Sequence, residues 1–200
     1  MVEYLALDLA VTVRHDGRGG VADDLSEPRG LTAWVREHAD SLGPWAPEFE
    51  ADSAAWDRAI ELRQAIRAQF AHAVAPGPAS PADVHRLPPL PEAVDRVNAA
   101  AARVPITPRL SWPDGAAPRR IVHTGDAADS DLLTAALARS AIDLLTGPHR
   151  TELRACTAPR CVRYFIKGHG RQEFCKPACG NRSRAARHYR RHRPATEPAA

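Results

Sequence analysis

The sequence contains no apolar stretch that approaches the length of a membrane span. The best candidate runs from Leu5 to Val13, but Asp8 and Arg14 interrupt it, whereas a spanning helix needs about 20 mainly apolar residues. The first residues also lack the basic start and the long apolar run that are typical of a secretory signal. We therefore expect a soluble, cytoplasmic protein with no membrane partner.

Signatures of catalysis are also missing. We find no glycine-rich phosphate loop, no Ser-His-Asp pattern and no convincing pair of carboxylates, so we do not expect an enzyme. No internal repeat indicates a solenoid. The length of 200 residues, of which 44% are hydrophobic, allows one domain of ordinary size with its own core and one small module.

Cysteine is scarce, and all of it lies in the last quarter of the chain. The spacing is C-x4-C-x13-C-x3-C, formed by Cys156, Cys161, Cys175 and Cys179. In a reducing compartment, close cysteine pairs favour a metal over two disulfides, which are the alternative. Four thiolates complete the tetrahedral coordination of Zn²⁺ and leave no position for a reactive water. We predict one structural zinc ion.

Positive charge is scarce in the first three quarters and concentrated after them. Residues 1–149 hold 14 Arg and Lys against 21 Asp and Glu, a net charge of −7, whereas residues 150–193 hold 13 against 2, a net charge of +11. Nearly all of this charge is arginine, which suits bidentate contacts to phosphate and guanine, although a GC-rich genome also favours arginine. The clustering predicts a polyanionic partner.

Hydrophobic periodicity predicts a mainly helical first domain with a small β element, hence an α+β fold. Residues 4–15 and Leu31–Ala39 favour short helices, and residues 16–20 and 23–28 favour a loop. We predict longer helices over Asp52–Val74, Ala82–Ala102 (interrupted near Pro88) and Asp129–Leu145, and a β-hairpin of residues 109–112 and 119–123. On the last helix we expect a buried face of Leu132, Leu133, Ala136, Ile142 and Leu145.

The cysteine-rich module is predicted to be a treble-clef-like zinc finger with the order knuckle, hairpin, helix. The hairpin is expected to pair residues 163–166 with residues 171–174, around the turn Lys167-Gly168-His169-Gly170. The helix is expected from Ala178 to His192, with Pro177 in its first turn. We place the domain boundaries at 1–148 and 152–193, followed by a disordered tail at 194–200.

The predicted final helix would present a basic face. Arg184, Arg187, Arg190 and Arg191 recur every three or four residues and so share one side. We expect contacts to double-stranded DNA, mainly through phosphates. The candidate nucleic-acid residues are Arg163, Lys167, Arg171, Lys176, Asn181, Arg182, Arg184, Arg187, Arg190, Arg191 and Arg193. A solvated basic face is the plain alternative, and His169 in a hairpin leaves a metal-dependent nuclease as a remote one.

From Cys179 to Arg182, the tetrapeptide Cys-Gly-Asn-Arg resembles the namesake motif of the CGNR zinc-finger family of bacterial proteins. The match spans about residues 153–193, and the earlier part of the chain resembles the ABATE domain that accompanies this finger. The residues that carry the second resemblance are Leu5–Asp8, Leu31–Trp34, Leu62–Ala65, Asn98 and Leu137–Ala141. The family usually has Asn before Thr12, where this chain has Val11.

The resemblance implies a stress-induced transcriptional regulator whose finger binds DNA, located on the nucleoid when bound. Its first domain would sense a small-molecule effector or mediate homodimerisation, and Asp8 and Trp34 are the candidate ligand residues. The plain alternatives are an N-cap or a buried pair with Arg14 for Asp8, and a core position for Trp34. A zinc module that binds RNA or protein remains the main alternative function.

Overall fold

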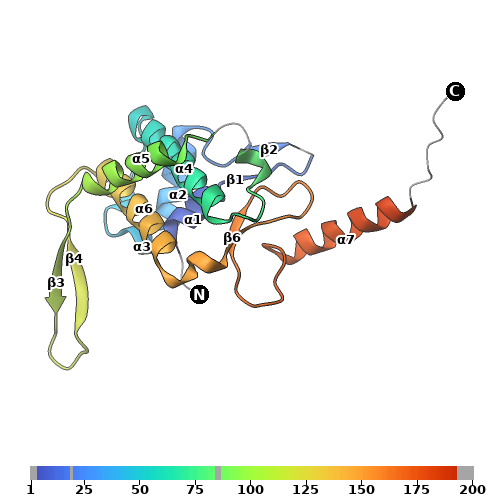
Figure 1. Ribbon diagram of the computed structural model, residues 1–200. Coiled ribbons are helices and arrows are strands. Elements are labelled where there is room, and N and C mark those ends of the chain that lie inside the picture. The colour runs from blue at the N-terminus through green and yellow to red at the C-terminus, as the bar shows by residue number, and fades with distance from the viewer. Residues whose placement is uncertain (1–3, 19, 84–86, 193–200) are drawn as a thin grey trace.

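The computed structural model describes residues 4–192 except residues 19 and 84–86. The predictions for Met1–Glu3, for Arg193 and for the tail at 194–200 lie outside these residues. Helices dominate, and every strand belongs to a two-stranded antiparallel sheet, so the α+β class is confirmed. Figure 1 shows a helical body, a β-hairpin that projects from one side of it, and a long C-terminal helix that leaves the other side.

The α-helices are α1 (Leu5–Ala10), α2 (Pro28–Glu37), α3 (Ala39–Leu42), α4 (Ser53–Ala73), α5 (Leu90–Ala102), α6 (Asp129–Thr146) and α7 (Pro177–His192). Short 3-10 turns are η1 (Ala46–Glu48), η2 (Pro81–Asp83) and η3 (Pro148–Glu152). The sheets pair β1 (Val13–His15) with β2 (Val21–Asp23), β3 (Thr107–Ser111) with β4 (Arg119–His123), and β5 (Leu153–Ala155) with β6 (Tyr164–Ile166).

Helix α4 is the centre of the first domain, as its apolar periodicity predicts. The Asp52 side chain caps it by accepting a hydrogen bond from the Ala55 amide at 2.6 Å. The predicted stripe is buried: Ala55, Ala59, Leu62, Ala65, Ile66 and Phe70. This stripe packs among α1, α2, α5 and α6, which gives the domain one continuous core.

Three expectations for the first domain were wrong. The helix expected over residues 4–15 ends at Ala10, because residues 13–15 form β1; this strand pairs with β2, so Asp23 is strand rather than loop. The predicted helix at 82–102 begins only at Leu90, because the prolines at 88, 89 and 91 disfavour helical backbone before them. Helix α6 lies between α1, α4 and α5, so its buried face is wider than predicted: Leu133, Thr134, Ala135, Leu137, Ala138, Ala141 and Leu144. Of the predicted face only Leu133 is fully buried, and Ile142 and Leu145 are half-buried against the core.

The prediction for the hairpin of the zinc module named the wrong partner strand for residues 163–166. Strand β6 pairs with β5, with Tyr164 opposite Ala155, and residues 171–174 form no strand. The Gln172 amide instead donates to the His169 carbonyl and closes a turn. The first cysteine pair therefore lies in the loop of the β5–β6 hairpin, and a turn leads on to α7.

The body and the cysteine cluster have separate cores. Leu153 on β5 and Tyr164 on β6 belong to the large core of the first domain. The cysteines form a second small cluster with Ala158, Phe165 and Phe174. Strands β5 and β6 thus anchor the module to the body. No helix in the described part of the chain has both the length and the apolarity that a membrane crossing requires.

Candidate metal centre and nucleic-acid interface

Two different local structures present the four cysteines. The first pair lies on a tight turn between β5 and β6, where the Cys161 amide donates to the Ala158 carbonyl at 2.9 Å and Arg160 has a left-handed φ of 65°. Cys175 lies just before α7, and Cys179 lies in its first turn. The Cys179 amide donates to the Lys176 carbonyl at 3.0 Å. The predicted start of this helix, with Pro177 in the first turn, is confirmed.

The four sulfurs have the spacing that a zinc ion requires. Sγ–Sγ distances are 3.7 Å for Cys161–Cys175, 3.5 Å for Cys175–Cys179 and 3.8 Å for Cys179–Cys161, and all four sulfurs lie within 4.8 Å of one another. Zn–S bonds of about 2.3 Å at tetrahedral angles place sulfurs about 3.8 Å apart. No two of them form a disulfide. The donor set therefore fits one structural zinc ion.

The thiol groups of the cluster also perturb one another strongly. The side-chain hydrogen bond from Cys161, followed by that from Cys175, lowers the pKa of Cys156 to about 2. The bond to the Cys156 thiolate in turn raises the pKa of Cys161 to about 11, and it raises the pKa of Cys175 as well. Without a metal the cluster thus favours a mixture of thiolate and thiols. Four thiolates can coexist here only around a positive ion.

Arg182 supports the centre from outside the four sulfurs. Its Nη2 donates to Cys179 Sγ at 3.2 Å, and the residue is half-buried. A hydrogen bond to a ligating sulfur orients the ligand and offsets part of the negative charge of a four-thiolate site. Arg182 was predicted as a nucleic-acid contact. The structure places its guanidinium beside the metal centre, and the contact to nucleic acid stays a prediction.

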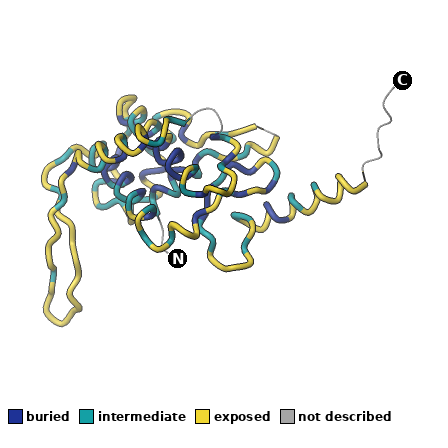
Figure 2. The backbone as a smooth tube through the Cα atoms, in the orientation of Figure 1, coloured by how far each residue is buried: buried dark blue, intermediate teal, exposed yellow. Residues whose placement is uncertain are grey.

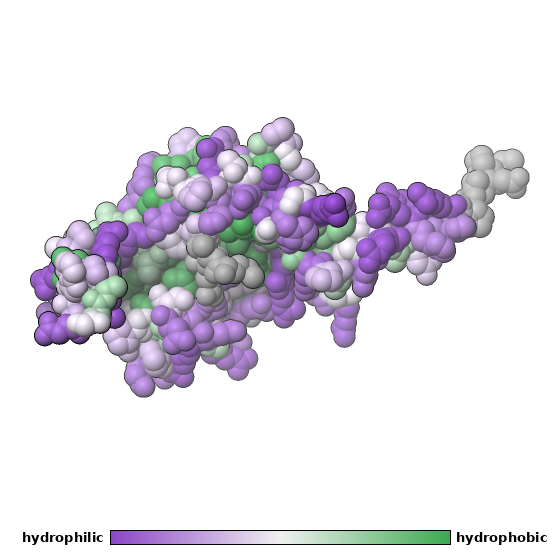
Figure 3. Space-filling view, turned by 90° about the horizontal axis from the view of Figure 1, so that it is seen from below, coloured by the Kyte–Doolittle hydropathy of each residue, from purple (hydrophilic) through white to green (hydrophobic). Residues whose placement is uncertain are grey.

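Helix α7 presents the predicted basic face to solvent. Arg184, Arg187, Arg190 and Arg191 are all exposed, and no acidic residue lies on the helix. Asn181 is exposed and accepts a hydrogen bond from Arg184. Sixteen residues span about 24 Å. In the view of Figure 3 the projecting helix is almost wholly hydrophilic.

The other predicted nucleic-acid residues lie elsewhere. Arg171 is exposed on the loop before α7. Arg163, Lys167 and Lys176 line a cavity of about 940 Å³ between α1 and the zinc module. The predicted set thus comprises an exposed group on α7, a cavity group, Arg171 on a loop and Arg182 beside the metal centre.

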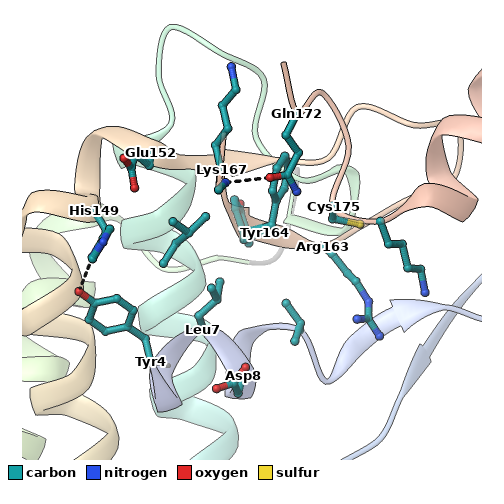
Figure 4. Close-up of a pocket in the computed structure, with 15 residues that line it drawn as sticks. Tyr4, Leu7, Asp8, His149, Glu152, Arg163, Tyr164, Lys167, Gln172 and Cys175 are labelled. Atoms are coloured by element: carbon teal, nitrogen blue, oxygen red, sulfur yellow. Dashed lines mark hydrogen bonds between the residues drawn. The ribbon is translucent and has the colours of Figure 1, made fainter. Parts of the chain in front are cut away.

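That cavity is the junction between the two parts of the chain (Figure 4). Tyr4 and His149 close one end, where the Tyr4 hydroxyl and His149 Nδ1 lie 3.0 Å apart. Cys175 and Arg163 lie at the other end in the close-up. Further lining comes from Leu7, Asp8, Val11, Glu152, Tyr164, Phe165, Ile166, Lys167, Gly168, Gln172 and Lys176.

The two residues predicted as ligand contacts do not share this cavity. Asp8 lines it, as does Val11, the position where the family usually has Asn. Trp34 is instead a core residue with 7% of its surface exposed, and its ring stacks on His38 with centroids 4.1 Å apart. Trp34 therefore fits its plain alternative, core packing, and is not part of the cavity lining.

A buried polar network joins the body to the zinc module, and sequence reasoning missed it. Arg67 and Asp83 form an ion pair at 2.8 Å with both side chains 3% exposed. The Tyr164 hydroxyl donates to Asp83 at 2.7 Å, and burial, followed by the Asp83 charge, raises the pKa of Tyr164. Arg67 and Ser80 also donate to the Val162 carbonyl, one residue after Cys161. The only signal of this network in the sequence was Arg67, an arginine among the apolar residues of α4.

The comparisons with known proteins agree with this division of the chain. Residues 3–148 match the ABATE family model, described as "Putative stress-induced transcription regulator". Residues 152–192 match the model of the CGNR zinc finger. No curated protein matches the sequence. The two matches confirm both resemblances.

Proposed function

Because the chain belongs to the ABATE family and ends in a CGNR zinc finger, we propose that it is a zinc-dependent regulator that binds double-stranded DNA through α7. The observation that carries this proposal is the exposed arginine face of α7, held at its N-terminal end by a four-cysteine zinc centre. The family description supports transcription regulation, and the basic face supplies the chemistry for DNA.

The N-terminal end of α7 is held in place, which distinguishes this helix from a flexible basic tail. Zinc ties Cys175 and Cys179 at the start of α7 to Cys156 and Cys161 in the β5–β6 loop. That hairpin is itself anchored in the core of the first domain. The helix can therefore enter a groove with its arginines already arranged on one side, which lowers the ordering entropy on binding.

We also propose that the chain acts by binding rather than by catalysis. Among the described residues, the four cysteines are the only cluster of three or more metal-ligating side chains. His169 is exposed on a turn outside this cluster, so the layout gives a nuclease little support. A module that binds RNA remains the second candidate, because phosphate contacts alone do not distinguish the two nucleic acids.

Replacing Arg184, Arg187 and Arg190 together with Ala should lower affinity for a short DNA duplex by about 100-fold at low salt. Each lost phosphate contact removes about 0.9 from the slope of log K against log salt. We therefore expect the slope to fall by about 3. Fluorescence anisotropy of a labelled duplex at several salt concentrations measures both quantities.

A matched control separates this effect from net charge. Arg18, Arg29 and Arg150 are exposed arginines outside α7, and their joint replacement with Ala removes the same charge. That variant should keep nearly all of its affinity. Equal losses in the two variants would contradict a specific interface on α7, and tighter binding of structured RNA than of duplex DNA would favour the second candidate.

We further propose that the cavity between α1 and the zinc module receives a small anionic effector with an apolar part. Three cations line it against two carboxylates, Asp8 and Glu152. An occupant would touch both α1 and β6, so binding there can change how the finger lies on the body. This assignment removes Arg163, Lys167 and Lys176 from the DNA contacts.

Two dyes that share an apolar body test the cavity. The anionic probe is 8-anilinonaphthalene-1-sulfonate, and the uncharged one is N-phenyl-1-naphthylamine. We expect the anionic dye to bind about 10-fold more tightly, and the double variant Arg163→Gln, Lys176→Gln to abolish that preference without lowering DNA affinity. Loss of DNA affinity in this variant, with dye binding unchanged, would return these residues to the DNA interface.

A further inference from the structure

The β3–β4 hairpin, residues 107–123, is called the arm below. It projects from the body as a two-stranded ribbon (Figure 1) and is exposed along nearly its whole length (Figure 2). Strands β3 and β4 contact each other extensively, and no other described element makes comparable contacts with either of them. Isolated two-stranded hairpins are only marginally stable in water. The arm therefore needs a partner surface that its own chain does not supply.

The strand register gives the arm an apolar face and a polar face. Residues directly opposite each other in an antiparallel pair share a face, and successive residues alternate. Pro108 lies opposite Val122, and Leu110 lies opposite Arg120. The other face carries Arg109 with Ile121 and Ser111 with Arg119. One side of the ribbon is thus mainly apolar, with a single arginine.

The exposure of this face is unusual for the molecule. Leu110 is 71% exposed, Trp112 at the end of β3 is 67% exposed, and Val122 is 50% exposed. Of the seven large hydrophobic residues that are exposed in the described part of the chain, four lie on the arm. A gathered apolar surface that includes a tryptophan and an arginine has the composition of a protein–protein hot spot.

Charge identifies the partner. The arm holds three arginines and one aspartate, a net charge of +2, whereas the remainder of residues 1–149 holds 11 Arg and Lys against 20 Asp and Glu, a net charge of −9. A first domain of the same sequence is therefore electrostatically complementary to the arm. Nucleic acid would satisfy the arginines but would leave Leu110 and Val122 in water.

We propose that the arm clasps the acidic first domain of a second copy of this chain, and that the two arms exchange to form a twofold dimer. In such an isologous pair each contact occurs twice, so the apolar patch of the arm contributes to the dimer interface two times. The dimer would present two α7 helices at once, and linked sites gain affinity without new contacts. This dimer contact is separate from the proposed DNA-binding function, because the arm is not part of the zinc finger.

Light scattering coupled to size-exclusion chromatography of the zinc-loaded full chain tests this inference. We expect a dimer for the unaltered protein at micromolar concentration. The double variant Leu110→Ser, Trp112→Ser should raise the dimer dissociation constant at least 100-fold and elute as a monomer. The matched control is Val21→Ser, Val94→Ser, which changes two exposed apolar residues of the body and should leave the dimer intact.

Circular dichroism and zinc content, unchanged in the arm variant, exclude misfolding as the cause of dissociation. A monomeric unaltered chain at about 100 µM overturns the proposal, as does a dimer that survives in the arm variant. An arm variant that keeps its oligomeric state but binds DNA less tightly overturns it as well and makes the arm a DNA contact. Because the oligomeric state is measured without DNA, failure of the α7 proposal leaves that measurement unaffected.

Discussion

Removal of the zinc ion should unfold the knuckle from Cys156 to Cys161 and the chain from residue 167 to the end of α7, while the first domain and strands β5 and β6 stay folded. The second cluster consists of the four cysteines, one alanine (Ala158) and two phenylalanines (Phe165 and Phe174), so it cannot balance the chain entropy of some 30 residues. Apparent binding free energies for structural zinc sites are about 10–16 kcal/mol at neutral pH. The ion is thus the main stabiliser of this module.

The anchoring of the β5–β6 hairpin limits how far the unfolding can spread. Leu153 and Tyr164 are 0% and 1% exposed in the core of the first domain, and the Tyr164 hydroxyl is bonded to Asp83. We therefore expect amide exchange to accelerate strongly in the knuckle and in α7 after chelation. Exchange at Leu153 and Tyr164 should accelerate much less, because their contacts do not involve zinc.

Hydrogen exchange with mass spectrometry, before and after chelation, measures this pattern. Cys175→Ser should reproduce it, and Ser183→Ala, on the same helix but without a ligand atom, is the matched control. DNA affinity should fall to the level of the triple arginine variant and return on addition of Zn²⁺. Uniform protection across residues 156–192 in metal-free protein would contradict a structural role for the ion.

The sequence predicted the elements whose signals are local. The period of α4 and its Asp52 cap, the Pro177 start of α7 and the β3–β4 hairpin all depend on residues within a few positions of one another. The cysteine spacing likewise specifies the metal site, because zinc requires four close thiolates wherever the intervening chain goes. These features were therefore accessible without a structure.

The missed features depend on contacts between distant segments. Strand β6 pairs with β5 rather than with residues 171–174, because Leu153 on β5 and Tyr164 on β6 are both buried in the core of the first domain. The buried face of α6 was only partly predicted, because three helices surround it. Likewise, the sequence suggests Arg163 and Lys176 as DNA contacts, and only the fold shows that they also line a cavity.

Asp83→Ala should destabilise the protein by about 3–5 kcal/mol, the range typical of removing one partner from a buried ion pair. The change leaves the Arg67 guanidinium buried without its carboxylate, and it removes the acceptor of the Tyr164 hydroxyl. Urea denaturation followed by far-ultraviolet circular dichroism measures the free energy of unfolding. Glu92→Ala is the matched control, because the Arg96–Glu92 pair is exposed and contributes less than about 1 kcal/mol.

A second variant separates the ion pair from the contacts to the zinc module. Replacing both partners, Arg67→Met with Asp83→Leu, removes the unpaired charge, and such exchanges are often neutral in buried sites. Recovery should nevertheless be partial here, because Arg67 also donates to the carbonyls of Ala10 and Val162. Full recovery of stability would mean that these two bonds contribute little.

The same double variant tests whether the network positions the finger. Val162 follows the zinc ligand Cys161 directly, so the bonds from Arg67 and Ser80 to its carbonyl fix where the knuckle leaves the body. If this attachment matters for function, the double variant should hold zinc normally yet show faster amide exchange at residues 162–166 and weaker DNA binding. Normal exchange at these residues would show that Ser80 and the apolar contacts of Tyr164 suffice to hold the module in place.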